Sequence, residues 1–387
     1  MESSRRNFLT ASLVLPVAGV ASAMDSPTPE PAPQQAKAPA GKLTYRTLGK
    51  TGMKVTTVGY GCMITSDPTV IARAVDMGIN YFDTSRNYQS GQNERMVGAA
   101  LGAKRKNVFL STKCDTKTGA GILAELDTSL KELKTDYLDV WYLHGLGTPA
   151  EITDDMVEAQ RKAKQQGKVR FIGVSTHALP AIVDRVIETK LDVVLAQYNF
   201  TSPADYTTGM DKLNAAGVGL VAMKVMAQAG RRGRGAAPGA PAAPPAKAGR
   251  QAAALKWVIN HPAVATTIPS MTDIDQLEEN FSVMGQTFTD SDSKVLTAAL
   301  QDVRPYFCSM CGQCDGQCPK GLPARDLVRF AMYADGYGQF GLGREHFQRM
   351  SAEHQAIRCG DCTSCAIKCP NGVRVAEQAM RAQELFA

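Results

Sequence analysis

The chain has 387 residues, of which 44% are hydrophobic and 21% charged, which is an ordinary composition for a soluble globular protein. This excludes a disordered, fibrous or disulfide-scaffold protein, and the length is enough for one large domain and a smaller one. The formal net charge of +6, spread over this length, gives no reason to expect a nucleic-acid partner. Eight of the ten cysteines lie between Cys308 and Cys369, which indicates a metal centre.

Residues 1–23 have the features of an export signal. Arg5 and Arg6 precede an apolar run that is too short to span a bilayer, and residues 21–23 (ASA) form a typical cleavage site. The arginine pair resembles a twin-arginine signal; a chance pair in front of a Sec-type signal is the alternative. We predict export to the periplasm or beyond, with a chain that is not membrane-spanning after signal cleavage. Residues 24–41 are expected to be a Pro- and Ala-rich linker.

From residue 42 to residue 285, short β-rich runs alternate with helical segments. Asp67 in front of Pro68 predicts a helix start, and Gly78 predicts its end. Eight strand–helix units in about 245 residues predict a (β/α)8 TIM barrel. A doubly wound sheet is the alternative, but no G-x-G-x-x-G turn follows the first strand. The runs LTYRTLG and MKVTTVG are expected to form a hairpin that closes the barrel floor. The predicted strands are Val55–Gly61, Ile79–Asp83, Val108–Lys113, Leu138–His144, Val169–Ser175, Val193–Gln197, Gly219–Met223 and Val264–Ile268.

Polar side chains stand at the carboxyl ends of three consecutive predicted strands. Asp83 ends the second strand, Lys113 the third and His144 the fourth, and Tyr88 lies in the loop after Asp83. A (β/α)8 barrel gathers its active site at this end of the strands, so we expect the four side chains to meet. An ammonium beside a phenol favours the phenolate, so Lys113 is expected to lower the pKa of Tyr88. The set predicts proton transfer by Tyr88 at a carbonyl or alcohol oxygen.

The predicted barrel resembles the aldo-keto reductase family. The similar segments are, in order, YFDTSRNYQSGQNERMVG, STK, YLHG, GVS, AQYNF and IPSMTDIDQLEEN. The resemblance implies hydride transfer between a nicotinamide cofactor and a small-molecule carbonyl or alcohol. It also implies that Tyr88 is the general acid or base, that Asp83 holds Lys113, and that His144 orients the substrate oxygen.

The resemblance further implies contacts to NADP or NAD, from the carboxamide to the adenine end. The residues at the matching positions are Ser175, Gln197, Met223, Glu279 and Asn280. The sequence departs from the family pattern in three places. Thr176 replaces the usual Asn, Met223 stands where many members stack an aromatic ring, and Thr272 replaces a basic residue that often meets the 2′-phosphate. These departures weaken the case for NADP over NAD, and for tight nicotinamide binding.

A basic, low-complexity stretch follows the seventh predicted strand. Residues 229–250 (AGRRGRGAAPGAPAAPPAKAGR) contain five basic residues and no acidic one. The family folds a loop over the cofactor at this position, so one interpretation is a basic lid over a pyrophosphate or another anion. The other interpretation, which we favour, is a disordered insertion without a partner.

Two cysteine runs of identical spacing lie in the C-terminal part. Each has the pattern C-x2-C-x2-C-x3-C-P of two-cluster ferredoxins, in which three close thiolates wrap one cubane and the fourth ligates the other cluster. Zinc would use two C-x2-C pairs and leave thiols over. We therefore predict two [4Fe–4S] clusters. The expected groups are Cys308, Cys311, Cys314 and Cys369 for one cluster, and Cys359, Cys362, Cys365 and Cys318 for the other.

The segment between the two runs has a helical pattern. We therefore expect a small, mainly helical ferredoxin-like domain at 306–387, after a connecting helix at 286–305. This arrangement resembles a subgroup of aldo-keto reductases that carry such a tail.

The chain is thus predicted to be an exported oxidoreductase that interconverts a carbonyl and an alcohol. Electrons would pass through the clusters to or from a redox partner protein or a quinone. Two alternatives stay open. In the first, the barrel no longer binds nicotinamide and uses another electron carrier, such as a quinone. In the second, the protein is an electron-transfer subunit whose barrel is a docking scaffold.

Overall fold

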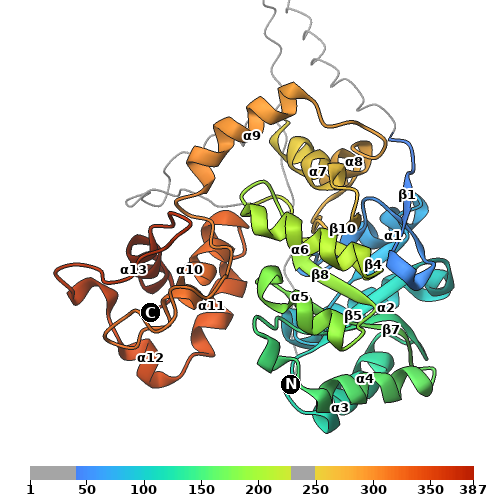
Figure 1. The fold of residues 1–387 in the computed structure, drawn as a ribbon, viewed down its shortest axis with the longest axis horizontal. Helices are drawn as coiled ribbons and strands as arrows, with labels where there is room; N and C mark the ends of the chain where they lie inside the picture. The colour runs from blue at the N-terminus through green and yellow to red at the C-terminus, as the bar shows by residue number, and fades with distance from the viewer. Residues whose placement is uncertain (1–40, 228–248) are drawn as a thin grey trace, which may run out of the picture. The chain divides into compact units, whose positions relative to one another are not determined.

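The barrel wall is one sheet of eight parallel strands. The computed structural model describes residues 41–227 and 249–387, and Figure 1 shows the strands surrounded by helices. The sheet order is β10-β9-β8-β7-β6-β5-β4-β3, and parallel bridges from Val58 to Thr267 and from Gly61 to Ser270 join its two ends. The predicted (β/α)8 barrel is confirmed. The strands are β3 (Tyr60–Gly61), β4 (Tyr81–Asp83), β5 (Phe109–Cys114), β6 (Leu138–Leu143), β7 (Val169–Thr176), β8 (Val193–Gln197), β9 (Gly219–Met223) and β10 (Val264–Thr267).

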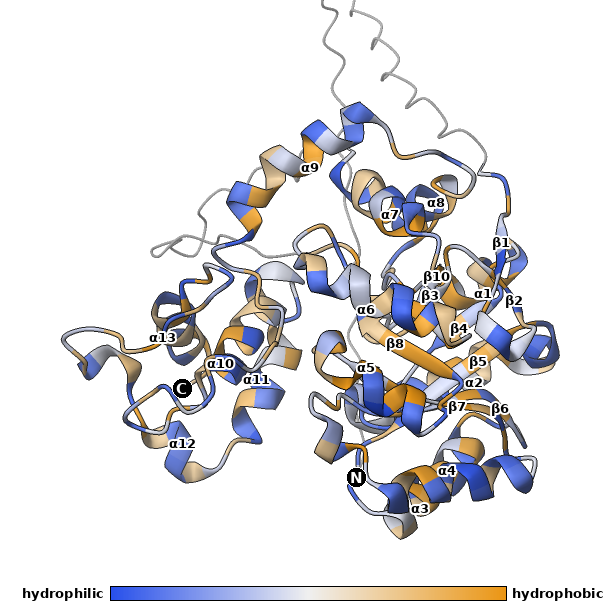
Figure 2. Cartoon of the chain, in the orientation of Figure 1, coloured by the Kyte–Doolittle hydropathy of each residue, from blue (hydrophilic) through white to orange (hydrophobic). Residues whose placement is uncertain are grey.

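The strands are apolar on both faces. β6 reads LDVWYL and β8 reads VVLAQ, and every residue of both is buried. Such uninterrupted burial is typical of parallel strands that are covered on both sides, and Figure 2 shows β8 as mainly hydrophobic. The strands pack so closely that Gly173 on β7 has no room for a side chain. A Cβ there would lie 2.2 Å from the Val193 carbonyl oxygen of β8.

Helices cover the barrel wall, and their ends follow the sequence signals. α1 starts after Asp67, whose carboxylate accepts a hydrogen bond from the Thr69 amide, and it stops before Gly78, which has a φ of 92°. α4 has two aspartates in its first turn and two lysines in its last, which complement the helix dipole. The barrel helices are α1 (Pro68–Asp76), α2 (Gln92–Leu101), α3 (Gly119–Glu132), α4 (Asp154–Gln165), α5 (Leu179–Glu188), α6 (Ala204–Ala215), α7 (Arg250–Asn260) and α8 (Ile274–Ser282).

The predicted first strand, Val55–Gly61, is wrong as a single element. Its start belongs to β2 (Lys54–Thr56), which pairs antiparallel with β1 (Tyr45–Thr47), and only β3 joins the barrel wall. The apolar sequence pattern continues from β2 into β3 because the residues of both strands are buried. The two strands are buried against different surfaces. β2 covers the barrel floor, whereas β3 pairs with β4.

The β1–β2 hairpin closes the amino end of the barrel, as expected. Leu48, Met53 and Val55 of this hairpin belong to the apolar cluster inside the barrel. The Lys50 amide donates to the carbonyl oxygen of Gly217, two residues before β9 begins. The hairpin therefore lies opposite the carboxyl ends of the strands, where the active site was predicted.

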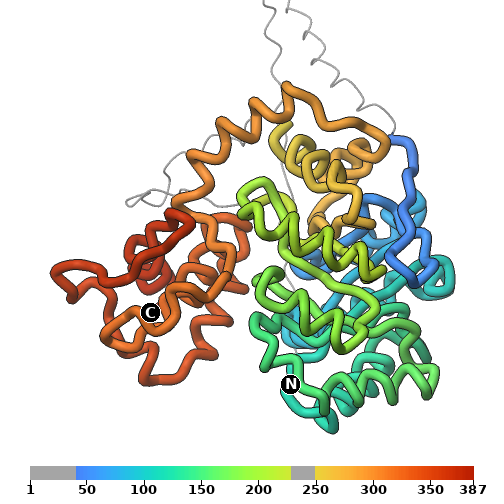
Figure 3. The backbone as a smooth tube through the Cα atoms, in the orientation of Figure 1, coloured from blue at the N-terminus to red at the C-terminus, as the bar shows by residue number. Residues whose placement is uncertain are grey.

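The C-terminal part is mainly helical, as predicted, and Figure 3 traces its backbone beyond α9 (Asp290–Val303). It has its own apolar cluster, which includes Leu327, Phe330, Tyr333 and Phe347. Its helices are α10 (Ala324–Ala331), the π-helical turn η5 (Met332–Gly336), α11 (Phe340–Gln348), α12 (Ala352–Ala356) and α13 (Val375–Phe386). Among the residues that the structure describes, no helix has the length and apolar character needed to cross a membrane.

Candidate active site and cysteine centres

The four predicted proton-transfer residues meet at the carboxyl ends of the strands, which we call the barrel mouth. Lys113 Nζ on β5 lies 2.5 Å from Asp83 Oδ2 at the end of β4, and these side chains are only 1% and 3% exposed. Nζ also donates to the Thr84 carbonyl oxygen at 2.6 Å and lies 4.8 Å from the centre of the Tyr88 ring. The His144 ring, after β6, faces the Tyr88 ring edge-on with 6.0 Å between centroids. The fold therefore places the other three side chains around the phenol of Tyr88.

A tight turn holds Tyr88 in place. Tyr88 opens the 3-10 turn η2 (Tyr88–Gly91), in which Gln89 and Ser90 have φ values of 51° and 53°. Non-glycine residues rarely adopt this conformation. Gln89 Nε2 donates to the backbone of the loop before α1 at 2.7 Å, and Ser90 Oγ donates to Glu345 Oε1 at 2.6 Å. Glu345 lies on α11, so the C-terminal part helps to fix the turn that carries Tyr88.

Burial decides the protonation state of Tyr88. Burial raises the pKa of this phenol, and the Lys113 ammonium offsets only part of the rise. The expected lowering of the Tyr88 pKa is therefore wrong, because desolvation disfavours the phenolate more than one ammonium favours it. Burial alone would lower the pKa of Lys113, but Asp83 and Tyr88 outweigh it, and the net pKa is raised. A protonated phenol beside a charged lysine is suited to donate a proton to a carbonyl oxygen.

His144 has a partner that the sequence analysis did not single out. His144 Nδ1 lies 2.7 Å from Asp115 Oδ1, and burial lowers the pKa of His144 although Asp115 opposes this. A neutral ring donates from Nδ1 to the carboxylate, which leaves Nε2 as an acceptor. Asp115 thus selects the tautomer of His144. The signal was available in the sequence, because Asp115 directly follows β5, whose end carries Lys113.

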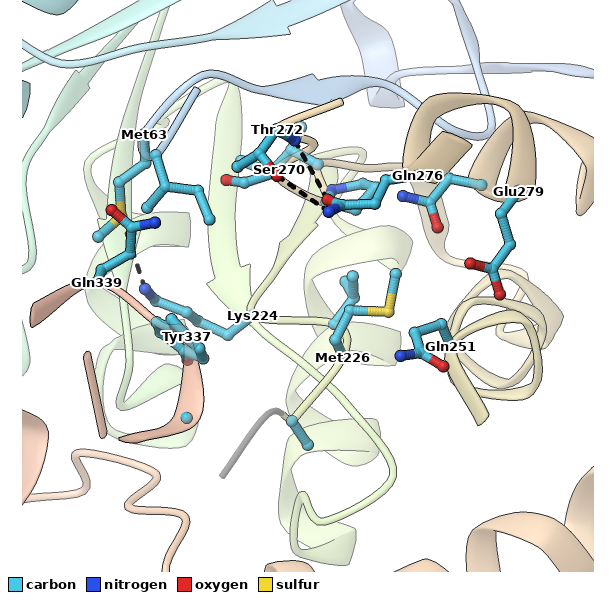
Figure 4. Close-up of a pocket in the computed structure, with 17 residues that line it drawn as sticks. Met63, Lys224, Met226, Gln251, Ser270, Thr272, Gln276, Glu279, Tyr337 and Gln339 are labelled. Atoms are coloured by element: carbon cyan, nitrogen blue, oxygen red, sulfur yellow. Dashed lines mark hydrogen bonds between the residues drawn. The ribbon is translucent and has the colours of Figure 1, made fainter. Parts of the chain in front are cut away.

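A pocket of about 310 Å³ opens beyond the ends of β9 and β10. Glu279 and Asn280, the predicted adenine contacts, line it together with Thr272, and Lys224 and Tyr337 line its other end (Figure 4). Its amide, carboxylate and hydroxyl groups fit the polar nucleotide end of NADP or NAD.

The three predicted nicotinamide contacts are engaged by the protein itself. Ser175 is fully buried, and its Oγ accepts a hydrogen bond from the Gly145 amide at 2.8 Å. Met223 packs in the apolar cluster inside the barrel. Gln197 Nε2 donates to the Ser309 carbonyl oxygen at 3.2 Å. The amide of Gln197, the predicted partner of a nicotinamide carboxamide, is therefore engaged by the C-terminal part in this structure.

The clustered cysteines form two groups of four. The first group lines one small cavity and the second lines a cavity of about 210 Å³, and all eight are free thiols. Each group takes three cysteines from one run and one from the other, as the repeated spacing predicts. The first group is Cys308, Cys311, Cys314 and Cys369, and the second is Cys318, Cys359, Cys362 and Cys365.

The chemistry of both groups fits an iron–sulfur cluster. Four thiols around one space are the ligand set of a cubane. Burial raises the pKa of Cys308 to about 12, and the neighbouring thiolates of Cys314 and Cys311 oppose its ionisation further. Thiolates that are gathered in this way are stabilised by a positively charged centre between them. Iron supplies that charge in such sites.

The first cysteine run packs against the barrel mouth. Phe307 and Met332 form an apolar cluster with Ala227 of the loop after β9, and Phe200 and Cys308 pack against it. Together with the Gln197–Ser309 hydrogen bond, this cluster makes the barrel mouth and the C-terminal part share one core.

Three predicted segments lie entirely or almost entirely outside the residues that the structure describes. The signal at 1–23 is one, and the linker at 24–41 is described only at its last residue. The basic stretch at 229–250 is described only at Gly249, the N-cap of α7, and at Arg250, the first residue of that helix.

The fold and this arrangement of residues define an oxidoreductase that is built from a (β/α)8 barrel and an iron–sulfur domain. Residues 66–301 match the Aldo/keto reductase family, and residues 307–373 match the 4Fe-4S dicluster domain. The chain belongs to the aldo/keto reductase family.

Known proteins resemble the chain at moderate identity. Uncharacterized oxidoreductase YqkF of Bacillus subtilis is 27% identical over 293 residues, which are 66% of this chain and 95% of that protein. L-galactose dehydrogenase of Arabidopsis thaliana is 29% identical over 282 residues, 63% of this chain and 88% of that enzyme. The holo form of an aldo-keto reductase from Bacillus halodurans superposes with a TM-score of 0.57 at 26% identity, covering 66% of this chain and 96% of that one.

Proposed function

We propose that the protein interconverts a carbonyl and an alcohol at Tyr88, and that electrons travel between this site and a redox partner through two [4Fe–4S] clusters. Reduction takes two electrons and two protons, since the C=O π bond breaks while one C–H and one O–H bond form. Bound nicotinamide would supply the hydrogen at carbon together with both electrons, as a hydride, and Tyr88 supplies the proton at oxygen. Two clusters that each carry one electron when bound match this electron pair. The partner is a redox protein or a quinone.

The side chains at the barrel mouth handle the proton at oxygen. Tyr88 gives its phenolic proton to the carbonyl oxygen, and in the reverse direction takes it from the alcohol. The charge of Lys113 stabilises the phenolate that remains, and Asp83 holds the ammonium in place. His144, oriented by Asp115, offers Nε2 as an acceptor that positions the substrate hydroxyl.

The hydrogen bond from Gln197 Nε2 to the Ser309 carbonyl oxygen is the observation that carries this proposal. Gln197 ends β8 at the barrel mouth, and Ser309 lies between Cys308 and Cys311, two members of the first cysteine group. One side-chain hydrogen bond thus separates the barrel mouth from the loop of the first cluster. Such direct contact suits electron exchange between the two sites.

Export by the twin-arginine pathway to the periplasm is part of the proposal. The arginine pair in front of an apolar run supports it. The cysteine groups support it as well. Eight thiols that crossed unfolded into an oxidising compartment could form disulfides, whereas a folded chain carries its clusters already assembled.

The contact between Gln197 and Ser309 also favours a second candidate function. It occupies the amide that would hold a nicotinamide carboxamide. In this candidate the barrel uses another carrier, such as a quinone. Bound nicotinamide would supply or accept a hydride in the first candidate. An electron path without nicotinamide would support the second candidate.

The first experiment is anaerobic reduction of the protein with its clusters intact. NADPH or NADH is added, and the visible absorption of the clusters is followed. Bleaching supports an electron path shared by nicotinamide and clusters. If dithionite bleaches the clusters and neither nucleotide does, nicotinamide is outside the path and the second candidate replaces the first.

The second experiment replaces the phenol. With a substrate found by screening small aldehydes, ketones and aldoses (one relative is an L-galactose dehydrogenase), Tyr88→Phe should lower turnover at least about 100-fold. Cluster reduction by dithionite should stay unchanged. Tyr45→Phe is the matched control, because the Tyr45 side chain is 50% exposed on the floor hairpin. Undiminished turnover in Tyr88→Phe would contradict the proposed role.

A further inference from the structure

Lys224 is a covered cation at the barrel mouth without a carboxylate partner among the described residues. It directly follows β9 and adopts a φ of 57°. Its Nζ lies 3.7 Å from Met63 Sδ, and 5.1 and 5.5 Å from the ring centres of Tyr337 and Tyr333. Figure 4 shows the Lys224 side chain beside Met63 and Tyr337 at one end of the pocket. The neighbours of its charge thus include one thioether sulfur and two aromatic rings, with the polar side chain of Gln339 lining the same end of the pocket.

A second cation reaches the same place from the C-terminal part. Arg329 on α10 donates from Nε to the Tyr333 hydroxyl at 2.5 Å, and its Cζ lies 5.4 Å from the centre of that ring. Burial alone would lower the pKa of Arg329, but Tyr333 and the carboxylate of Asp326, three residues earlier on α10, outweigh it, and the net pKa is raised. Lys224 and Arg329 therefore approach the same tyrosine from the barrel and from the C-terminal domain.

The two cations repel each other where water is excluded. Burial lowers the pKa of Lys224 to about 7, and the charges of Arg329 and Lys113 contribute to this. Keeping two cations close together in a covered site costs free energy. Such arrangements are typical of sites where a ligand brings the missing negative charge.

An unsatisfied histidine lies at the same mouth. His177 directly follows β7, and its Nε2 is buried without a hydrogen-bond partner in the described structure. After burial, the charges of Arg329 and Lys224 are the main causes of its strongly lowered pKa. Buried polar atoms are almost always paired. A ligand that enters near these cations could therefore also reach this nitrogen.

We propose that Lys224 and Arg329 together bind an anionic group, a carboxylate or a phosphate, of the molecule that reacts at Tyr88. This rests on the proposed function, and it narrows the substrate class to acids that carry a carbonyl or alcohol. Guanidinium and ammonium groups are the usual ligands of such oxygens. Arg329 lies on α10, so the C-terminal domain would complete the substrate site. The helix α10 is followed directly by the π-helical turn η5. π-helical turns are frequent at functional sites.

Calorimetric titration of the anaerobic holoprotein tests the proposal without turnover. The probes are lactate and inorganic phosphate, with 1,2-propanediol as the uncharged counterpart of lactate. Both anions should bind and the diol should not. Lys224→Gln should weaken anion binding at least about tenfold, the size expected for one charge-assisted hydrogen bond. Lys224→Arg should restore it.

The controls separate a local effect from a general one. Lys162→Gln and Arg344→Gln remove exposed charges from α4 and α11 and should leave anion binding unchanged. Arg329→Gln should match Lys224→Gln; if it does not fold, Lys224→Gln alone decides. Wild-type affinity in Lys224→Gln, or no anion binding by the wild type, overturns the proposal. Tyr88→Phe should bind inorganic phosphate with wild-type affinity, because phosphate has no carbonyl or alcohol group for the phenol to contact. Failure of the catalytic assignment is thereby distinguishable from failure of the anion site.

Repeating the titration in saturating NADPH shows whether the bound anion belongs to the substrate or to the nucleotide. Lactate that still binds beside NADPH supports an acid group on the substrate. If NADPH displaces both anions, Lys224 and Arg329 hold a phosphate of the nucleotide, and the assignment to the substrate is overturned.

Discussion

At the scale of single residues, the active site depends on one buried ion pair. Lys113 Nζ contacts Asp83 Oδ2 and the Thr84 carbonyl oxygen, while Asp83 Oδ1 accepts a hydrogen bond from Ser111 Oγ at 2.7 Å. Apolar residues of the same volume often stabilise a protein as well as such a pair does. The pair is therefore better explained by its effect on Tyr88 than by its contribution to stability.

Lys113→Met should lower the free energy of unfolding by about 3–5 kcal/mol, because it leaves the Asp83 carboxylate buried without a counter-charge. The double variant Lys113→Met/Asp83→Leu should recover most of this loss and still lack turnover. Urea denaturation of the anaerobic holoprotein measures both. Lys104→Met, which breaks an exposed pair with Asp76, should cost less than about 1 kcal/mol. A double variant as unstable as the single one would contradict this account.

At the scale of secondary-structure elements, the β1–β2 hairpin stabilises the barrel from the end opposite to the site. Arg46 Nη1 on β1 donates to the carbonyl oxygens of His261 and Val264 at 2.9 and 2.7 Å. These carbonyls lie at the end of α7 and the start of β10, where the barrel wall closes on β3. One side chain thus ties the floor to the closing strand.

Arg46→Met should destabilise the protein by about 1.5–3 kcal/mol, the range for lost hydrogen bonds to a charged donor. Turnover per folded molecule should be unchanged, since the hairpin is remote from Tyr88. The comparison is Arg73→Met, which breaks an exposed 3.7 Å pair with Glu278 and should cost less than about 1 kcal/mol. Equal losses in the two variants would show that the hairpin does not depend on Arg46.

At the scale of the whole molecule, the C-terminal domain is both a cluster carrier and a cover for the barrel mouth. Several contacts join it to the barrel, among them Gln197 with Ser309, Ser90 with Glu345, Lys224 with Tyr337, and the apolar cluster around Phe307. The cysteine loops themselves contain only short turns, so their fold depends on what the cysteines bind.

Removal of iron with an oxidant and a chelator should loosen these loops first. Hydrogen exchange at residues 308–323 and 357–374 should rise, because bound metal supplies part of the folding free energy. Exchange should also rise at η2, which loses its support from α11, while β5 to β8 stay protected. The same treatment of Cys318→Ser, which lacks one ligand of the second group, should have a smaller additional effect. Unchanged exchange at 308–323 would mean that this loop folds without iron.

Much of the molecule follows from local sequence signals. Alternating apolar runs and capping residues predicted the eight-stranded barrel, since strand burial and helix starts depend on neighbouring residues. The cysteine spacing predicted which thiols share a cavity, because each run can place three ligands around one point. The positions of Asp83, Lys113 and His144 at strand ends predicted that they meet, because a parallel barrel brings all such ends to one face.

Other features depended on tertiary structure. Gln197 and Ser309 are 112 positions apart, and no spacing rule links the end of a barrel strand to a cysteine loop. The Tyr88 pKa has the opposite direction from that expected, because the degree of burial is a property of the packed site. No sequence motif singles out Lys224 or Arg329. Only the docking of the C-terminal domain on the barrel excludes water around them and sets their charges against each other.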